Sequence, residues 1–168
     1  MNKSPKLVCK NVWKLYGDNP KEFLQIHNNN PDKKTIEAGG YIQAIRNASL
    51  EVYENEILVI MGLSGSGKST LVRCMSRLVD PTIGEIFFEN IDMGKLTKNE
   101  LIEIRRHKMG MVFQHFALFP HRTVIENIAF PLEVQGIKRR EREKTALEII
   151  ELVGLQGREN YFPKELSG

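Results

Sequence analysis

The stretch that decides the fold is Gly62-Leu63-Ser64-Gly65-Ser66-Gly67-Lys68-Ser69-Thr70. It fits the phosphate-binding loop pattern G-x-x-x-x-G-K-[ST], in which Gly62 and Gly67 are the two fixed glycines. Glycines let the backbone curl so that successive N–H groups point inward at a nucleotide's phosphates. In this pattern the Lys68 ammonium can reach the β- and γ-phosphates, and the Ser69 hydroxyl can ligate Mg²⁺. Every residue of the stretch is therefore a candidate for binding a nucleotide.

The flanks of this loop have the context that the pattern requires. Residues 57–61, Ile-Leu-Val-Ile-Met, are a continuous apolar run and predict a buried strand. After the loop, apolar residues recur at helical spacing, namely Leu71, Val72, Met75, Leu78 and Val79. A loop between a strand and a helix places its phosphate at a helix N-terminus, where the helix dipole favours an anion.

Composition narrows the class of protein. The 168 residues suit one domain, and the net charge of +3, from 24 basic and 21 acidic side chains, is too balanced to indicate nucleic acid by itself. Cys9 and Cys74 lack metal-ligand spacing, so we expect two buried thiols in a reduced, cytosolic setting. The longest apolar run is far short of a membrane span, and residues 1–6 lack the apolar stretch of a secretory signal. Any membrane role would therefore come through a partner.

Other segments predict a mixed α/β chain. Strands are expected at 7–16, within 41–52, at 84–88 and at 109–113, and residues 17–40 read as a polar loop with a short helix near Phe23. Thr97 and Thr123 each begin a capping box, and the helix after Thr123 is expected to end at Pro131. Residues 138–153 are an amphipathic helix whose basic side chains alternate with glutamates, so we expect a solvated face.

Three further segments carry a resemblance to a known family. They are Met111-Val112-Phe113-Gln114, the stretch at 116–127 that begins Phe-Ala-Leu-Phe-Pro-His, and Glu165-Leu166-Ser167-Gly168. With the phosphate loop they resemble the ATP-binding subunits of ABC transporters, where a glutamine loop, a helical subdomain and an L-S-G-G signature follow in this order. The sequence of these motifs is most similar to that of the glycine betaine/proline betaine (quaternary amine) importers. The long insert between Tyr16 and Tyr41 also suits that branch of the family.

The resemblance implies an α/β fold with a P-loop NTPase (ABC ATPase) core. On this basis residues 1–56 form an N-terminal β subdomain with the polar insert at 17–40. Residues 57–113 form the P-loop part of the core with a partial parallel sheet, and residues 114–168 form the glutamine loop and helical subdomain up to the start of the signature. The C-terminal part of the core is expected to be missing from the chain as read.

The resemblance also assigns roles to individual positions. Lys68 and Gln114 match catalytic positions of the family, and Ser69 and Gln114 match its Mg²⁺ site. The alternative for Gln114 is a purely structural role as a polar residue at the end of a strand. Tyr16 matches an aromatic that stacks on adenine, although Trp13 or Tyr41 could take this place and a Tyr at a strand end is often core. Ser167 and Gly168 match the signature that completes the opposite subunit's site.

No run of four apolar residues followed by Asp-Glu occurs in the chain. We therefore expect the Walker B strand, the catalytic acid and the switch histidine to be absent, which leaves hydrolysis by this chain uncertain. Apolar strands without neighbours expose backbone groups, so we also expect the isolated chain to be marginally stable and prone to aggregate.

The resulting expectation is a truncated ATP- and Mg²⁺-binding, energy-coupling subunit of an importer for betaine-type solutes. Its implied partners are a transmembrane permease, a second copy of the full-length subunit and an extracytoplasmic solute-binding protein, without nucleic acid, at the inner face of the cell membrane. The alternatives are an amino-acid importer ATPase and a non-catalytic remnant that only binds nucleotide. A P-loop kinase or GTPase is a further alternative, but it leaves Gln114 and Leu166-Ser167-Gly168 unexplained. A nucleic-acid binder is supported only by the small excess of basic over acidic side chains.

Overall fold

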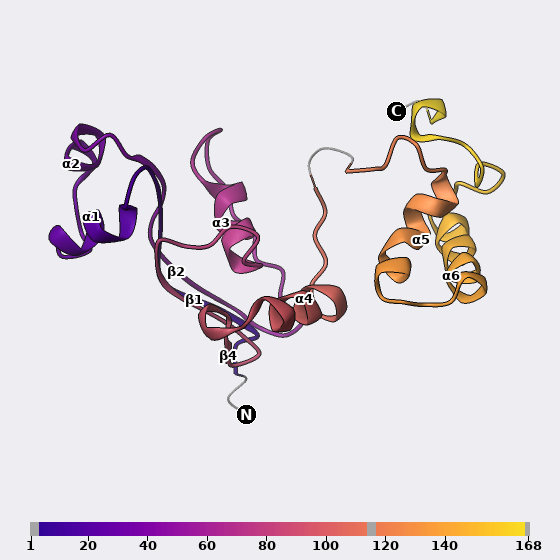
Figure 1. The fold of residues 1–168 in the computed structure, drawn as a ribbon, viewed down its shortest axis with the longest axis horizontal. Helices are drawn as coiled ribbons and strands as arrows, with labels where there is room; N and C mark the ends of the chain where they lie inside the picture. Colours follow the sequence, from indigo (N-terminus) through magenta and orange to yellow (C-terminus); the bar gives the residue numbers. More distant parts are fainter. Residues whose placement is uncertain (1–3, 114–116, 167–168) are drawn as a thin grey trace. The chain divides into compact units, whose positions relative to one another are not determined.

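A four-stranded antiparallel sheet organises the N-terminal part of the chain (Figure 1). The computed structural model describes residues 4–113 and 117–166, and the chain divides into two compact units, Met1–Ile102 and Glu103–Gly168. In the first unit the strand order is β2-β1-β3-β4, so β2 is an edge strand. The strands are β1 (Leu7–Tyr16), β2 (Ile42–Val52), β3 (Ile83–Phe88) and β4 (Ile91–Asp92). The strands predicted at 7–16, within 41–52 and at 84–88 are therefore confirmed.

The core of the first unit joins β1 to the insert. Trp13 and Leu15 of β1 pack with Leu24 and Ile36, and all four side chains are essentially inaccessible to solvent. Leu24 lies on α1 (Pro20–Ile26) and Ile36 on α2 (Lys33–Ala38). The short helix predicted near Phe23 is confirmed as α1, whereas α2 was read as loop and is a correction, because each of the two helices buries an aliphatic side chain here. Burying each side chain contributes about 1.5–3 kcal/mol to folding, enough to order a mostly polar segment.

The remaining helices of this unit follow the sheet. They are α3 (Lys68–Met75), the 3₁₀ turn η1 (Met93–Lys95) and the beginning of α4 (Lys98–His107). The predicted capping box before α4 is confirmed, since Thr97 N donates to Glu100 Oε2 at 2.8 Å and Glu100 N donates to Thr97 Oγ1 at 3.3 Å. Cys9 and Cys74 are buried free thiols, as expected. Burial, with a smaller contribution from nearby Cys74, raises the pKa of the Cys9 thiol to about 11.

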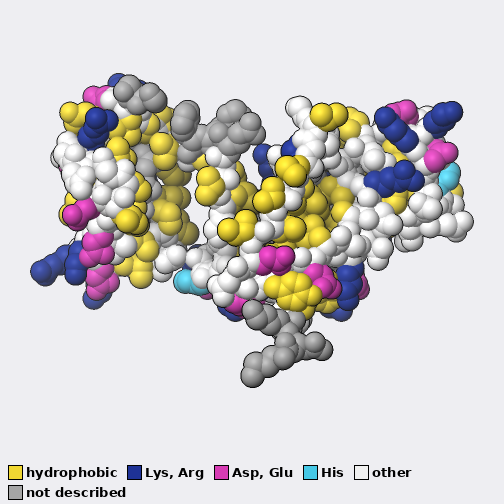
Figure 2. Space-filling model, turned by 180° about the vertical axis from the view of Figure 1, so that it is seen from behind, with side chains coloured by type: hydrophobic (Ala, Val, Ile, Leu, Met, Phe, Trp, Pro, Cys, Tyr) yellow, Lys and Arg dark blue, Asp and Glu magenta, His cyan; other side chains and the backbone are white. Residues whose placement is uncertain are grey.

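The strands predicted at 57–61 and 109–113 were wrong. Neither segment pairs with a strand in the described part of the chain, and neither forms a helix or a strand. Ile57, Met61 and Val112 are 90%, 86% and 100% exposed, respectively. The physical reason is that a parallel strand is ordered by hydrogen bonds to its neighbours, and no described segment supplies them. Hydrophobic side chains are accordingly visible at the surface in Figure 2.

The second unit is built on two helices that pack side by side, α5 (Val124–Val134) and α6 (Arg139–Leu152) (Figure 1). Ala129 of α5 and Ala146 and Ile150 of α6 are buried. The segment after α6 returns to the beginning of α5, where Val124 N donates to the carbonyl of Tyr161 at 2.8 Å. A 3₁₀ turn, η2 (Pro163–Glu165), follows. The amphipathic helix predicted at 138–153 is confirmed as α6.

The helix after Thr123 is confirmed at its start and corrected at its end. Thr123 N donates to Glu126 Oε2 at 2.8 Å and Glu126 N donates to Thr123 Oγ1 at 3.4 Å, so the capping box is formed. The prediction that Pro131 terminates the helix was wrong, because α5 continues through Pro131 to Val134. A proline inside a helix removes one hydrogen bond and crowds the preceding turn. The capping box and the packing against α6 stabilise the helix enough to retain it.

Within the described residues, no helix is both long enough and apolar enough to cross a lipid bilayer.

Candidate nucleotide-binding site

The phosphate loop leads directly into α3, as the sequence predicts. Gly67 is the residue before the helix, with φ 90°, and Gly65 has φ 76°, so both occupy the left-handed region that favours glycine. No side chain caps the start of α3. The first N–H groups of an α-helix have no acceptor within the helix, so this end can donate to an anion.

Gly67 is also the point where the loop approaches the sheet. A Cβ atom added at Gly67 would overlap the carbonyl oxygen of Ala44, which lies in the edge strand β2. Only a residue without a side chain allows the two backbones to come this close. The tight approach places the beginning of α3 beside β2, the edge strand of the sheet among the described residues.

The side chain of Lys68 forms hydrogen bonds with the phosphate loop itself. Its Nζ donates to the carbonyl oxygens of Gly62 at 2.7 Å and Leu63 at 2.6 Å, and to Ser66 Oγ at 3.2 Å. The ammonium is thus held by three oxygen atoms of the loop that carries it. Phosphate oxygens bear a full negative charge and form stronger hydrogen bonds to an ammonium than neutral carbonyls do. A bound phosphate could therefore replace these contacts.

A pocket of about 790 Å³ adjoins the loop. Ligand sites in proteins commonly measure about 300–1,000 Å³. Three segments of the first unit form its wall: the phosphate loop with the start of α3, the first half of β2, and α2 with the residue Tyr41. The loop residues predicted from the motif are thereby joined by a second set from the insert, which the motif did not reveal.

The three aromatic residues considered for stacking on adenine differ in their position relative to the pocket. Tyr16 is 43% exposed at the end of β1, with Lys14 Nζ 4.9 Å from its ring centroid, and it is not one of the residues that line the pocket. Tyr41 lines the pocket, packs on Phe23 with a centroid distance of 4.2 Å, and donates its hydroxyl to the carbonyl of Asp18. Trp13 is 1% exposed and belongs to the core, so it has no free face to stack on a ligand.

Of the other predicted site residues, some lie in α3 and the rest lie outside the described residues. Ser69 is exposed in the first turn of α3, and Thr70 follows it. Gln114, Ser167 and Gly168 lie outside the described residues. The described part of the chain holds no cluster of three or more His, Cys, Asp or Glu side chains that could bind a metal. A hydroxyl such as that of Ser69, together with phosphate oxygens and water, is a donor set that suits Mg²⁺.

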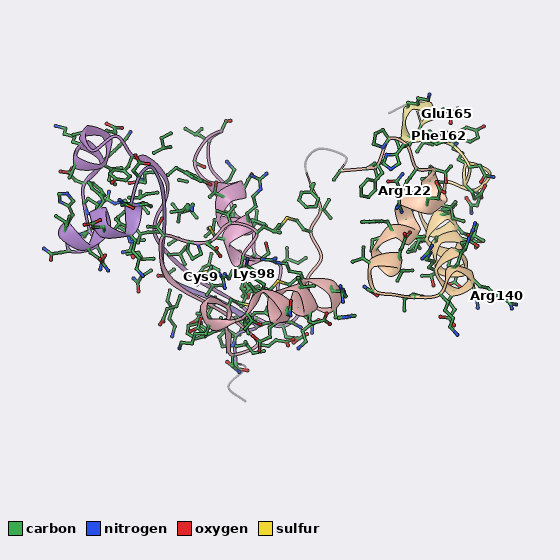
Figure 3. The ribbon with its side chains drawn as sticks, viewed as in Figure 1. Cys9, Lys98, Arg122, Arg140, Phe162 and Glu165 are labelled. Carbon is green, nitrogen blue, oxygen red and sulfur yellow. The ribbon has the colours of Figure 1, made fainter. Side chains whose placement is uncertain are left out.

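A second polar centre, not predicted from the sequence, orders the turn before α5. The side chain of Asn127 accepts a hydrogen bond from Phe119 N at 2.7 Å and donates to the carbonyls of Phe119 at 3.1 Å and Arg122 at 2.9 Å. Arg122, labelled in Figure 3, lies over the rings of Phe119 and Phe130 and pairs with Glu133 at 3.1 Å. The only sequence signal was an asparagine and an arginine beside apolar residues.

Comparison with known proteins agrees with this geometry. The model of the ABC transporter family matches residues 45–168. The chain belongs to the ABC transporter family. The match includes the phosphate loop, α3 and the whole second unit, and it confirms the α/β ABC ATPase fold class expected from the sequence.

Similar proteins place the chain within the family. It is 56% identical over 164 residues to the trimethylamine N-oxide transport system ATP-binding protein TmoW of Pelagibacter ubique, covering 98% of this chain and 48% of that protein. It is 48% identical to the glycine betaine transport ATP-binding protein OpuAA of Bacillus subtilis, covering 97% of this chain and 39% of that protein. The chain thus spans half or less of the length of these relatives. The predicted resemblance to betaine-type importer subunits is confirmed.

A solved structure gives the same result for the fold. The dimeric post-hydrolysis state of the ATP-binding cassette MJ0796, bound to ADP and Pi, superposes with a TM-score of 0.75 at 35% identity. The superposition covers 96% of this chain and 63% of that one.

Proposed function

We propose that this chain is the ATP-binding, energy-coupling part of an ABC importer for small methylated-amine solutes of the betaine type. The observation that carries the proposal is the Lys68 ammonium, which is surrounded by loop oxygens beside a pocket of about 790 Å³. Membership of the ABC transporter family supports ATP as the nucleotide.

Each residue of the loop has a distinct role in this proposal. The backbone N–H groups of Gly65, Gly67 and the first turn of α3 donate to phosphate oxygens. Lys68 leaves its carbonyl partners and neutralises charge on the terminal phosphates. The Ser69 hydroxyl, with Gln114, would hold Mg²⁺, which when bound supplies charge neutralisation across the β- and γ-phosphates. Tyr16 or Tyr41 would support the base.

The activity proposed for residues 1–168 is nucleotide binding. Hydrolysis also needs an acidic group that orients the attacking water, and no apolar run followed by Asp-Glu occurs in this sequence. Hydrolysis is therefore proposed for the energy-coupling subunit as a whole, with a second copy contributing its signature at the positions of Ser167 and Gly168. The dimeric state of the MJ0796 cassette supports such a pairing.

The proposed partners are a transmembrane permease and, in the same system, an extracytoplasmic solute-binding protein, with the subunit at the cytoplasmic face of the membrane. A nucleic-acid partner is not part of the proposal, because three of the basic side chains of α6, namely Arg139, Arg142 and Lys144, pair with carboxylates. Arg139 pairs with Glu143 at 2.7 Å and Arg142 with Glu133 at 3.6 Å.

Two solute classes follow from the relatives. The names of TmoW and OpuAA give trimethylamine N-oxide and glycine betaine as the solutes of those systems. Both molecules carry a methylated, positively charged nitrogen, so we propose this chemistry as the solute class. An amino-acid importer is the second candidate, and uptake of labelled betaine, trimethylamine N-oxide and amino acids in cells with and without the gene would separate them.

Nucleotide titration tests the binding step directly. We expect ATP to bind the 168-residue chain, and Lys68→Ala to weaken binding at least about 100-fold, as loss of a charge-assisted contact to a phosphate implies. Lys144→Ala is the matched control, because Lys144 is exposed on α6 and its removal changes the net charge equally. Equal ATP affinity of the Lys68→Ala and Lys144→Ala proteins would reject the proposed function.

A further inference from the structure

A pocket of about 430 Å³ lies in the second unit, lined by α5, α6 and the turn before α5. Its volume falls in the lower part of the range of about 300–1,000 Å³ that is common for ligand sites, so it suits a small molecule. Opposite charges are present in equal number on its wall, from three arginines and three glutamates: Arg122, Arg139 and Arg142, with Glu126, Glu133 and Glu143. Every lining residue belongs to the second unit, so the pocket is formed without any residue of the phosphate loop.

The helical period brings these side chains together. On α6, Arg142 and Glu143 follow Arg139 by three and four positions, so all three lie on one face of the helix. On α5, Ala129 follows Glu126 by three positions and lies on the same face as that glutamate. Ala129 is buried and lines the pocket, and its methyl group is too short to fill the space between the longer charged side chains. The packing of α5 against α6 therefore leaves a recess with charges around its wall.

The guanidinium of Arg142 has donors that no described residue uses. Its Nη2 lies 3.6 Å from Glu133 Oε2, which is an ion pair too long for a hydrogen bond. The same carboxylate oxygen already accepts a hydrogen bond from Arg122 Nη1 at 3.1 Å. The Arg142 side chain is only 24% exposed, yet its nitrogen atoms are not sealed from solvent, so they face the open space of the pocket. A guanidinium carries five N–H groups in a planar fork, so Arg142 can bind a carboxylate through two parallel hydrogen bonds.

Two carboxylates on the wall remain available to a positive charge. Glu126 Oε2 accepts hydrogen bonds from Thr123 N at 2.8 Å and Thr123 Oγ1 at 3.1 Å, and these bonds hold the ionised carboxylate in place. Glu143 pairs with Arg139 at 2.7 Å, but the Arg139 side chain is 80% exposed. Such an exposed ion pair contributes little to stability, so a ligand can displace it at small cost.

We propose that this pocket binds a small zwitterion, whose carboxylate pairs with Arg142 and whose positively charged nitrogen lies between Glu126 and Glu143. A simple anion would be repelled by three carboxylates, and a simple cation by three guanidinium groups. A molecule that carries both charges a few bonds apart can place each one beside its opposite.

Two kinds of molecule share this chemistry. One is a methylated-amine solute such as glycine betaine, and the other is a free amino acid such as glycine. The ammonium of glycine can donate hydrogen bonds to the glutamates, whereas the trimethylammonium of betaine is attracted by charge alone. The zwitterion class follows from the pocket itself, and the inference rests on the proposed function only in naming betaine as one of the two probes.

The first test compares ligands on the unaltered 168-residue chain by calorimetry. We expect glycine betaine or glycine to bind saturably, with a Kd of about 10 mM or lower, as suits a ligand of so few atoms. The compound 3,3-dimethylbutanoate has the shape of betaine with carbon in place of the charged nitrogen, and choline keeps that nitrogen but lacks the carboxylate. Each should bind at least about tenfold more weakly than betaine if betaine is the ligand, because each has lost one charged contact.

The outcomes of this series are distinct. Tighter binding of betaine than of glycine supports the inference and assigns the pocket to the methylated-amine class, while the reverse order supports it and assigns the pocket to amino acids. For glycine, acetate and methylammonium are the corresponding single-charge controls. Absence of saturable binding by both zwitterions, or single-charge controls that bind as tightly as the zwitterion, would overturn the inference.

The second test removes the guanidinium. Arg142→Met keeps most of the aliphatic length of the side chain and should weaken binding of the zwitterion at least about tenfold. Arg140→Met is the matched control, because Arg140 is an exposed arginine on the same helix, does not line the pocket and carries the same charge. Equal affinity of the two variants for the zwitterion would overturn the inference.

ATP binding separates a failure of this inference from a failure of the proposed function. Both variants should bind ATP as the unaltered chain does, since the phosphate loop belongs to the first unit, and this also shows that they are folded. Loss of zwitterion binding with Lys68-dependent ATP binding intact would overturn the inference alone. Zwitterion binding that depends on Arg142 in a chain that does not bind ATP would support the inference and reject the proposed function.

Discussion

Gly67 and Ala44 approach so closely that the phosphate loop and the edge strand of the sheet leave no room for a side chain between them. This relationship fixes the loop at the start of α3, where the phosphates are proposed to bind. It also distinguishes Gly67, a fixed glycine of the sequence motif, from Gly65, which stands at one of the variable positions of the motif. Gly65 has a similar left-handed backbone, yet a Cβ atom built there meets nothing within 4 Å.

The first prediction uses this pair of glycines. Gly65→Ala should cost about 1–2 kcal/mol of stability, the cost of holding an L-residue in the left-handed region. Gly67→Ala adds a clash with a backbone oxygen and should cost at least about 2 kcal/mol more, with loss of nucleotide binding. Thermal unfolding of both variants measures the difference, and equal melting temperatures would show that the approach of Gly67 to Ala44 is not tight.

The second prediction concerns the arginine of the second unit. Arg122 lies 5.3 Å from the centroid of Phe119 and 4.9 Å from that of Phe130, and it pairs with Glu133. Each cation–π contact contributes about 0.5–1 kcal/mol, and a partly exposed ion pair contributes about 0.2–1 kcal/mol. Arg122→Ala should therefore reduce the free energy of unfolding by about 1–3 kcal/mol.

Urea unfolding followed by circular dichroism checks this value. Arg140→Ala is the control, because Arg140 is an exposed arginine on α6 (Figure 3) and its removal changes the charge by the same amount. A shift of the urea midpoint in Arg122→Ala no larger than that in Arg140→Ala would contradict the stabilising role of the two rings.

The features predicted correctly from the sequence are those that depend on neighbours in the chain. The phosphate loop and the capping boxes at Thr97 and Thr123 are set by residues within a few positions of one another. Within the insert the helix near Phe23 was predicted but α2 was missed, because a helix of six residues is too short to show a helical period, and nothing in the sequence marked Leu24 and Ile36 as core. Their burial depends on Trp13 and Leu15, which are distant in sequence.

Residues 57–61 show the opposite error. Their apolar run has the composition of a buried strand, but a strand exists only when another segment pairs with it, and composition cannot supply that segment. Gln43 illustrates a third limit, because a glutamine in a strand carries no sequence signal that its Oε1 is buried without a hydrogen-bond partner in the described part of the chain. Its place in the pocket emerges only when α2, β2 and the phosphate loop are brought together.

The third prediction is a pH dependence of α5. Hydrogen bonds from the backbone N–H and hydroxyl of Thr123 hold the pKa of Glu126 below its ordinary value of 4.5. A carboxylate whose pKa is lower in the folded state stabilises the fold at pH values above its unfolded pKa. The contribution of Glu126 to the stability of α5 should therefore decline as the pH falls below the ordinary value of 4.5, and it should be lost once the pH is below the lower, folded pKa.

Glu126→Gln isolates this contribution, because glutamine retains an acceptor for Thr123 but does not titrate in this range. We expect the variant to be less stable than the unaltered chain at neutral pH and to lose less stability on acidification. Urea midpoints measured at several pH values give the dependence of stability on pH for the unaltered chain and for Glu126→Gln. Parallel curves for the two proteins would mean that Glu126 titrates normally, and the capping box would then stabilise α5 through its neutral hydrogen bonds alone.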